Sequence, residues 1–330
     1  MLTYGPPPFG TSVDRFTRDG VRLCDAKTVS CRVGSRPSES AFSKSCFQLL
    51  CIQGAFALNP VGSENKLFRW RLLGRVLLFL VSGALALATT GPLAQKIPGQ
   101  KGNLVLALVA AFEAFALTVL FVRWERLPLG SVGARPSRGS LLRFAFGFLA
   151  GLVLVAVYAS ISAAAGHIRW VRAPGTGFVA TLMGLFTYVA LSCREELGFR
   201  GYPLLRLKAF CGVWGAQIIV ALAFAAEHMA GGLPFSRAIL GAGVGSLMFG
   251  MAALTTRGLA VPIGLHAAWN FGDWILGGKG SPGLWQVVVE EGQQQRAQFV
   301  GTVGYLAVMS LATIAFWMWN RSKTKLESQT

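Results

Sequence analysis

The chain has 330 residues, of which 53% are hydrophobic and 14% are charged, whereas about 25% of the residues in an average soluble protein are charged. This composition excludes an ordinary soluble domain, because a soluble protein of this length needs many more charged residues to cover its surface. The net charge of +17 alone would fit nucleic-acid binding. However, the basic residues lie mainly near the N-terminus and in short breaks between apolar stretches, a distribution typical of membrane proteins.

The N-terminal segment 1–65 is rich in Ser, Pro, Gly and Arg and lacks a sustained apolar pattern. It is predicted to be a polar, basic and poorly ordered tail. Its one apolar patch is too short to span a membrane and lacks the features of a secretory leader. We expect a transmembrane helical domain over residues 66–320 and a basic cytoplasmic tail over residues 321–330.

Apolar stretches separated by polar breaks fill the rest of the chain, and each approaches the ~20 residues that a membrane-spanning helix needs. This pattern predicts an all-α polytopic membrane protein, a bundle of about eight transmembrane helices. Lys and Arg are more numerous in alternate breaks, which places both termini in the cytoplasm. The predicted spans are Leu72–Thr90, Leu104–Val122, Phe144–Ala165, Gly177–Cys193, Val213–Ala226, Ala238–Thr256, Gly258–Leu276 and Val300–Asn320.

Ionisable side chains inside these spans are candidates for function, because each costs several kcal/mol unless it is paired or solvated. The candidates are Glu113, Glu195, Glu196, Arg200, Glu227, His228, His266 and Asp273. Glu227 projects about 100° away from His228 on a helix, so a supporting role and a lumen-facing one are both open. We expect Glu113 to make a polar contact within the bundle and Asp273 to lie near the membrane interface.

Three short patterns hold most of these residues. The first, Glu195-Glu196-Leu-Gly-Phe-Arg200, places Glu196 and Arg200 four residues apart on one helical face, where they can form an ion pair. Two adjacent carboxylates exceed what one Arg needs, so Glu195 stays available for chemistry. The patterns Phe224-x-x-x-His228 and His266-x-x-x-Asn270 also pair side chains four residues apart, and we expect all three to face one cavity.

The depth of these motifs in the membrane determines how far the fourth predicted helix must extend. For Glu195 to meet the two His residues, its helix must continue past the motif to about Leu207. We expect a kink in this extension, because Gly198, Gly201 and Pro203 follow the motif closely.

The motifs EExxxR, FxxxH and HxxxN, in this order on successive spans, resemble those of the CPBP family of intramembrane proteases, which includes the type II CAAX prenyl endopeptidases. The resemblance covers about residues 141–276. It implies an eight-helix fold that encloses an intramembrane catalytic chamber, and an endopeptidase acting on a peptide or protein substrate at the lipid bilayer.

The resemblance also implies roles for individual residues. Glu195 would be the general base, helped by His228, and His266 and Asn270 would stabilise the oxyanion. Supporting roles would fall to Glu196, Arg200 and Phe224.

Two sets of alternatives stay open at this stage. His228, His266 and Glu195 could together hold a catalytic zinc ion. We favour a mechanism without a cofactor, because the chain has no HExxH motif and Asn270, the helical partner of His266, is a poor zinc ligand. The chain could also be a catalytically silent membrane binding or immunity-type protein, or a transporter that uses the Glu and His residues as a proton relay.

Overall fold

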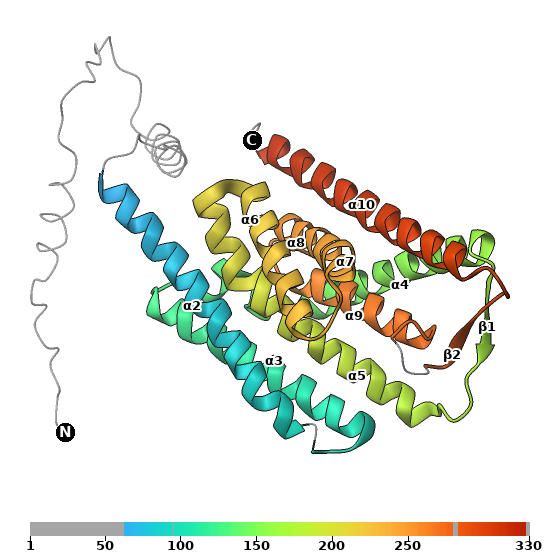
Figure 1. Cartoon of the computed structure of the whole chain (residues 1–330). Helices are drawn as coiled ribbons and strands as arrows, with labels where there is room; N and C mark the ends of the chain where they lie inside the picture. The colour runs from blue at the N-terminus through green and yellow to red at the C-terminus, as the bar shows by residue number, and fades with distance from the viewer. Residues whose placement is uncertain (1–62, 95, 280–282, 328–330) are drawn as a thin grey trace, which may run out of the picture. The chain divides into compact units, whose positions relative to one another are not determined.

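The structure is a computed structural model that describes residues 63–94, 96–279 and 283–327. The predicted tail therefore lies outside the described residues up to position 62. The described chain is almost entirely helical, with one pair of short strands (Figure 1). Its elements are α2 Ser63–Ala94, α3 Gly99–Trp124, the 3-10 helix η1 Leu129–Val132, α4 Ser140–Ala165, β1 Ile168–Arg172, α5 Phe178–Glu195, the π-helix η2 Glu196–Gly201, α6 Tyr202–Ala230, α7 Phe235–Arg237, the π-helix η3 Ala238–Gly243, α8 Val244–Thr256, α9 Ala260–Ile275, β2 Trp285–Val289 and α10 Gln294–Glu327.

Six helical segments of the described chain are long and apolar enough to cross a membrane, which confirms an all-α multi-pass membrane protein. The count of about eight is approximate, for two reasons. The fourth and fifth predicted spans lie in one helical segment, Phe178–Ala230, which is broken at Cys211 and Gly212, and the seventh is the 16-residue helix α9. Protein surrounds this short helix: 11 of its 16 residues are buried, against 4 of 26 in α4.

The segment from α5 to α6 carries the first two motifs and, as predicted, continues as a helix past Leu207. The predicted kink takes the form of the π-helix η2, and Pro203 occupies the first turn of α6, where a proline is tolerated. The sharp break comes later, at Cys211 and Gly212. Gly212 adopts a φ of 75°, which favours glycine because it has no Cβ. The chain then doubles back.

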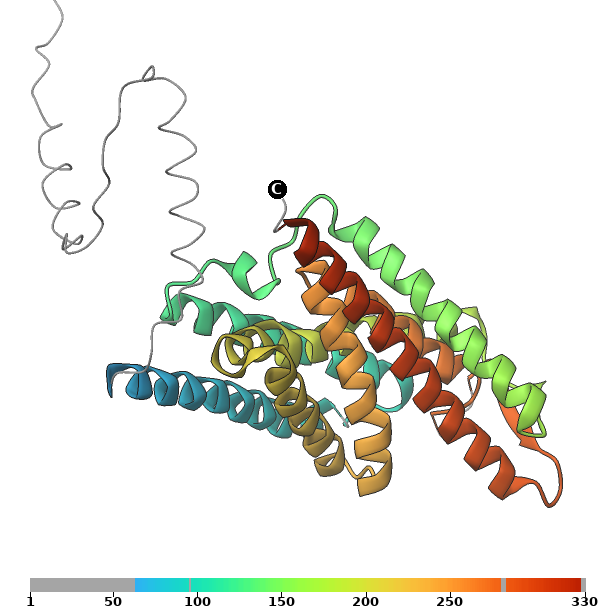
Figure 2. The same ribbon diagram turned by 90° about the horizontal axis from the view of Figure 1, so that it is seen from above.

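Close helix packing sets the position of α9 against α4. A Cβ atom on Gly151 would come within 2.7 Å of the Ala268 side chain and of the Leu265 carbonyl oxygen, so only glycine allows this approach. Small residues at such interfaces are typical of helices that pack within membranes. Helix α9 also contacts α5 and α8, and α4 runs beside α10 (Figures 1 and 2). His266 is thereby held in the interior of the bundle.

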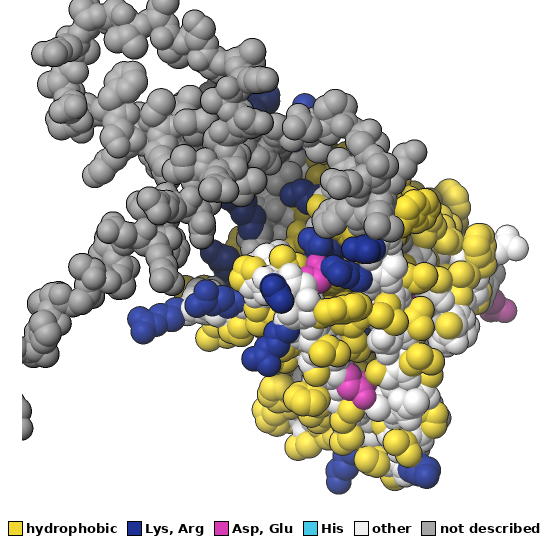
Figure 3. Space-filling view, turned by 90° about the vertical axis from the view of Figure 1, so that its left-hand side faces the viewer, with side chains coloured by type: hydrophobic (Ala, Val, Ile, Leu, Met, Phe, Trp, Pro, Cys, Tyr) yellow, Lys and Arg dark blue, Asp and Glu magenta, His cyan; other side chains and the backbone are white. Residues whose placement is uncertain are grey.

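The outer surface of the bundle fits a lipid environment. In Figure 3 it is largely apolar, and Lys and Arg side chains gather toward one end of this apolar surface. Large apolar side chains such as Leu77 and Phe112 are exposed on α2 and α3. Because lipid tails solvate such groups, this exposure is expected of helices that line the outside of a membrane bundle.

The last helix is longer than predicted. Residues 321–327, assigned to a cytoplasmic tail, form the end of α10. Three contacts explain the extension: the Arg321 guanidinium lies over the Trp317 ring, the Lys323 ammonium lies over the Trp319 ring, and Glu327 forms an ion pair with Arg257. Cation–aromatic contacts and an ion pair both stabilise a helix end at the membrane surface.

Candidate active site

One cavity of about 650 Å³ brings the three motifs together. Glu195 from α5, His228 from α6, and His266 and Asn270 from α9 all line it, and Phe224 lies among them. The structure thus gathers all four predicted catalytic residues around one space within the bundle. The wall also includes Tyr158, Tyr188, Arg237, Phe249, Trp269, Asp273, Lys279, Gln298 and Tyr305.

The two adjacent glutamates face different surroundings. Glu195 lines the cavity, whereas Glu196 is completely buried beside it. Glu196 Oε1 accepts a hydrogen bond of 2.8 Å from His266 Nδ1 and lies 3.3 Å from Arg200 Nη1, so the predicted Glu196–Arg200 ion pair is present. The Arg200 guanidinium is also completely buried and stacks 4.3 Å from the centre of the Phe224 ring. Glu196 therefore anchors both His266 and Arg200.

Glu196 determines the orientation of the His266 ring. A carboxylate only accepts hydrogen bonds, so His266 Nδ1 carries a proton. The other ring nitrogen, Nε2, faces the cavity. Nε2 lies 3.3 Å from Glu195 Oε2. The Phe249 ring stacks on the imidazole at 4.1 Å between centres, with an interplanar angle of 17°. These contacts fix His266 as a rigid bridge between the two glutamates.

His228 is oriented by its own helix. Its Nδ1 lies 2.9 Å from the Phe224 carbonyl oxygen, and because a carbonyl only accepts, Nδ1 is the donor. In the neutral ring, Nε2 is then the nitrogen that can accept a proton. The Phe224 ring lies 4.4 Å from the His228 ring and 6.2 Å from the His266 ring, centre to centre. Phe224 therefore packs against both imidazoles.

The cavity also contains Lys279 and Asp273, which the sequence did not place in it. Lys279 Nζ donates a 2.9 Å hydrogen bond to Asn270 Oδ1 and lies 3.5 Å from Asp273 Oδ2. Asp273, expected at the membrane interface, lines the cavity. Its spacing of seven residues from His266 could have signalled this, because residues seven apart share a helical face. Lys279 follows the end of α9, where no helical period applies.

The residues of the zinc alternative do not form a metal-binding arrangement. Within the residues that the structure describes, no group of three or more His, Cys, Asp or Glu side chains could hold a metal ion. Both ring nitrogens of His266 face carboxylates, and His228 Nδ1 faces a backbone carbonyl. Coordination by Glu195, His228 and His266 would therefore require these side chains to rearrange.

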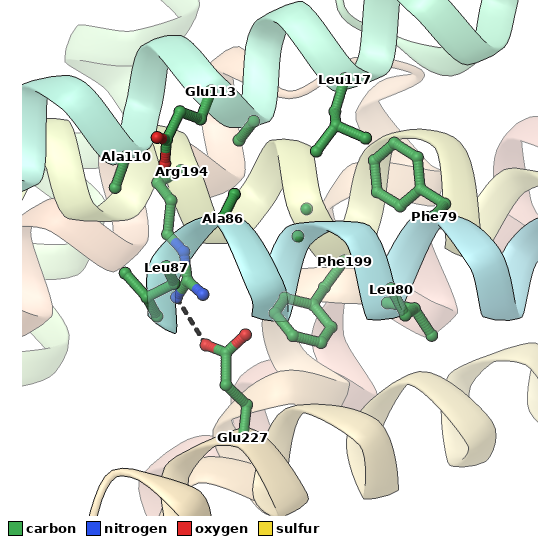
Figure 4. Close-up of a pocket in the computed structure, with 13 residues that line it drawn as sticks. Phe79, Leu80, Ala86, Leu87, Ala110, Glu113, Leu117, Arg194, Phe199 and Glu227 are labelled. Carbon is green, nitrogen blue, oxygen red and sulfur yellow. Dashed lines mark ion pairs between the residues drawn. The ribbon is translucent and has the colours of Figure 1, made fainter. Parts of the chain in front are cut away.

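Glu227 does not face the large cavity, although it adjoins His228. It lines a separate, smaller cavity together with Glu113 and Arg194 (Figure 4). Glu227, for which the sequence allowed a supporting or a lumen-facing role, forms an ion pair with Arg194 at 2.5 Å. Glu113, expected to make a polar contact, lies 3.5 Å from the Thr90 hydroxyl.

A comparison with protein families matches residues 176–272 to the type II CAAX prenyl endopeptidase Rce1-like family. This match begins later than the expected core of 141–276 and contains all three motifs. A comparison with curated proteins finds no match. Residues 176–272, which include the four residues that meet in the large cavity, thus match the type II CAAX prenyl endopeptidase Rce1-like family, in agreement with the resemblance seen in the motifs.

Proposed function

We propose that the protein is an intramembrane endopeptidase that hydrolyses peptide bonds of membrane-associated substrates, with water activated by Glu195 and His228 and no metal ion. The family is a peptidase family, which supports a hydrolase. The observation that carries the proposal is the convergence of Glu195, His228, His266 and Asn270 on one cavity. A cavity of about 650 Å³ falls within the usual range for ligand sites.

In the proposed reaction, a water molecule lies between the Glu195 carboxylate and His228 Nε2. Glu195 takes a proton from this water while the water oxygen forms a bond to the carbonyl carbon of the scissile peptide bond. The tetrahedral intermediate then collapses, the C–N bond breaks, and the proton passes from Glu195 to the leaving amine. All atoms and charges balance without a further reactant.

The negative charge that develops on the carbonyl oxygen needs hydrogen-bond donors. Asn270 can supply one, because Lys279 occupies its Oδ1 and leaves the Nδ2 amide to donate. His266 supplies the second from Nε2 when the ring carries both protons. In a site shielded from water, each such donor contributes about 3–4 kcal/mol to the stability of the transition state.

The test uses the purified protein in lipid vesicles with membrane-associated peptides, and cleavage is followed by mass spectrometry. His228→Ala should lower kcat at least 100-fold, because it removes the second group that holds the attacking water. His167→Ala is the matched control. His167 lies outside the cavity, between α4 and β1, and pairs with Glu290 at 2.8 Å. Full activity in His228→Ala would overturn the proposed mechanism.

A chelator distinguishes the metal-free mechanism from a zinc-dependent one. We expect cleavage by the wild-type protein to survive prolonged dialysis against a strong chelator, because the proposed steps use only the side chains of this chain. Activity that disappears on dialysis and returns with added zinc would contradict the metal-free proposal and favour coordination by Glu195, His228 and His266.

Lys279→Met should lower kcat about 10-fold. The substitution removes the donor to Asn270 Oδ1, so the amide can turn and present its oxygen to the oxyanion. We expect Lys279→Arg to retain more activity, because arginine still donates. The check is steady-state kinetics of both variants, and equal activity of Lys279→Met and wild type would show that Lys279 does not orient Asn270.

A further inference from the structure

An ion pair lies on a different face of α5 from the one that lines the large cavity. Arg194 and Glu227 point toward one another across the smaller cavity (Figure 4), with Arg194 Nη1 2.5 Å from Glu227 Oε1. This cavity measures about 30 Å³, enough for about one water molecule. Both side chains are mostly buried, with exposed fractions of 11% and 20%. No step of the proposed reaction uses them.

The position of this ion pair along the chain is informative. Arg194 directly precedes Glu195, and Glu227 directly precedes His228. Adjacent helical residues project about 100° apart, so each pair of neighbours places one side chain in each cavity. The ion pair therefore connects α5 to α6 one residue away from the proposed base and one residue away from its partner.

Arg194 also reaches the proposed base directly. Its Nη1 lies 3.7 Å from Glu195 Oε1, while Glu195 Oε2 lies 3.3 Å from His266 Nε2. Each oxygen of the Glu195 carboxylate thus faces a different partner. Two partners on opposite oxygens restrict the rotation of the carboxylate about its last bond.

The surroundings make the ion pair a firm connection. The smaller cavity is lined mainly by apolar side chains, including Phe79, Leu117 and Phe199. Opposite charges attract more strongly in such a low-dielectric environment than at a surface. Glu113 is a second carboxylate in this wall, so Arg194 faces negative charge from α3, α5 and α6.

From this geometry we propose that Arg194, anchored by Glu227, is a positioning residue that orients the Glu195 carboxylate and sets its spacing from His228. The inference rests on the proposed peptidase function and deepens it. Loss of the anchor lets Arg194 turn toward Glu195 and lets the two helices move apart. A displacement of about 1 Å between reacting groups can cost about 100-fold in rate.

The test measures kcat and KM for Glu227→Gln, Arg194→Gln and the double variant. We expect each single variant to lower kcat about 10- to 100-fold with KM within about twofold of wild type, because neither residue lines the large cavity. The kcat of the double variant should be no lower than that of the less active single variant, since the two residues act as one unit. Glu227→Asp, which keeps the charge, should recover part of the activity.

Arg257→Gln is the matched control. Arg257 forms an ion pair of the same length, 2.5 Å, with Glu327, but at the exposed end of the bundle. Unchanged kcat in Glu227→Gln, a raised KM with constant kcat, or an equal loss in Arg257→Gln would overturn the inference. If Arg194→Gln fails to fold, the kcat values of Glu227→Gln and Glu227→Asp still test the inference. No cleavage by the wild-type protein would instead reject the proposed function.

Discussion

Glu195→Gln is expected to lower peptide cleavage at least 100-fold while the protein stays folded. Glutamine has the same shape as glutamate but cannot take a proton from water, so the attacking nucleophile is not formed. Folding should survive, because Glu195 Oε2 has no hydrogen-bond partner among the described residues, and the charge contacts of the carboxylate are long, 3.3 Å from Oε2 to His266 and 3.7 Å from Oε1 to Arg194. Initial rates of cleavage and melting temperature in detergent together check this prediction.

Glu291→Gln is the control for the same chemical change. Glu291 is exposed in the turn between β2 and α10 and does not line the cavity. Its substitution should leave the rate unchanged. Equal rates for Glu195→Gln and wild type would show that another group activates the water, or that the reaction does not begin with water at all.

Arg200→Met should produce the largest loss of stability, about 3–5 kcal/mol of unfolding free energy. Glu196 and Arg200 are both completely buried, and their charged atoms lie 3.3 Å apart. Removal of the arginine leaves a buried carboxylate whose remaining partner is the Nδ1 of His266. The expected readout is a large fall in melting temperature and a lower yield of folded protein.

A second substitution distinguishes the stability lost with the charge pair from the stability lost with the packing of the arginine side chain. In the double variant Glu196→Gln with Arg200→Met no unpaired charge remains, so most of the lost stability should return. Arg257→Met, which breaks an exposed ion pair, should cost about 0–1 kcal/mol. A double variant as unstable as Arg200→Met alone would show that arginine packing against Phe224, and not charge pairing, stabilises this part of the bundle.

The sequence was sufficient to predict which side chains of the three motifs meet. Three motifs with partners four residues apart place each pair on one helical face, and charged groups in apolar spans have few alternatives to meeting one another. His266 shows how far this reasoning reaches: its place in the cavity was predicted, whereas its simultaneous contact with Glu195 and Glu196 depends on how α9 is rotated against α5.

Features that depend on tertiary structure could not be predicted. The fourth and fifth spans were predicted to be separate, and the break at Cys211 and Gly212 separates them; the nearly unbroken helix that connects them could not be read from hydropathy, because charged residues such as Arg206 and Lys208 lie between the two apolar stretches. The pairing of Arg194 with Glu227 depends on the change of direction that the chain makes at Cys211 and Gly212. Lys279 lies in a turn, where side-chain direction follows from the local backbone and not from a repeat.

The central claim is that Glu195 and His228 act on the same water molecule, and a double-variant kinetic comparison tests it most directly. The cleavage rates of Glu195→Gln, His228→Ala and the variant with both changes are measured on one peptide in one vesicle preparation. If the two residues form one unit, the double variant should be no more than about threefold slower than the slower single variant. Losses that multiply in the double variant would show that the two residues act independently and would contradict the account.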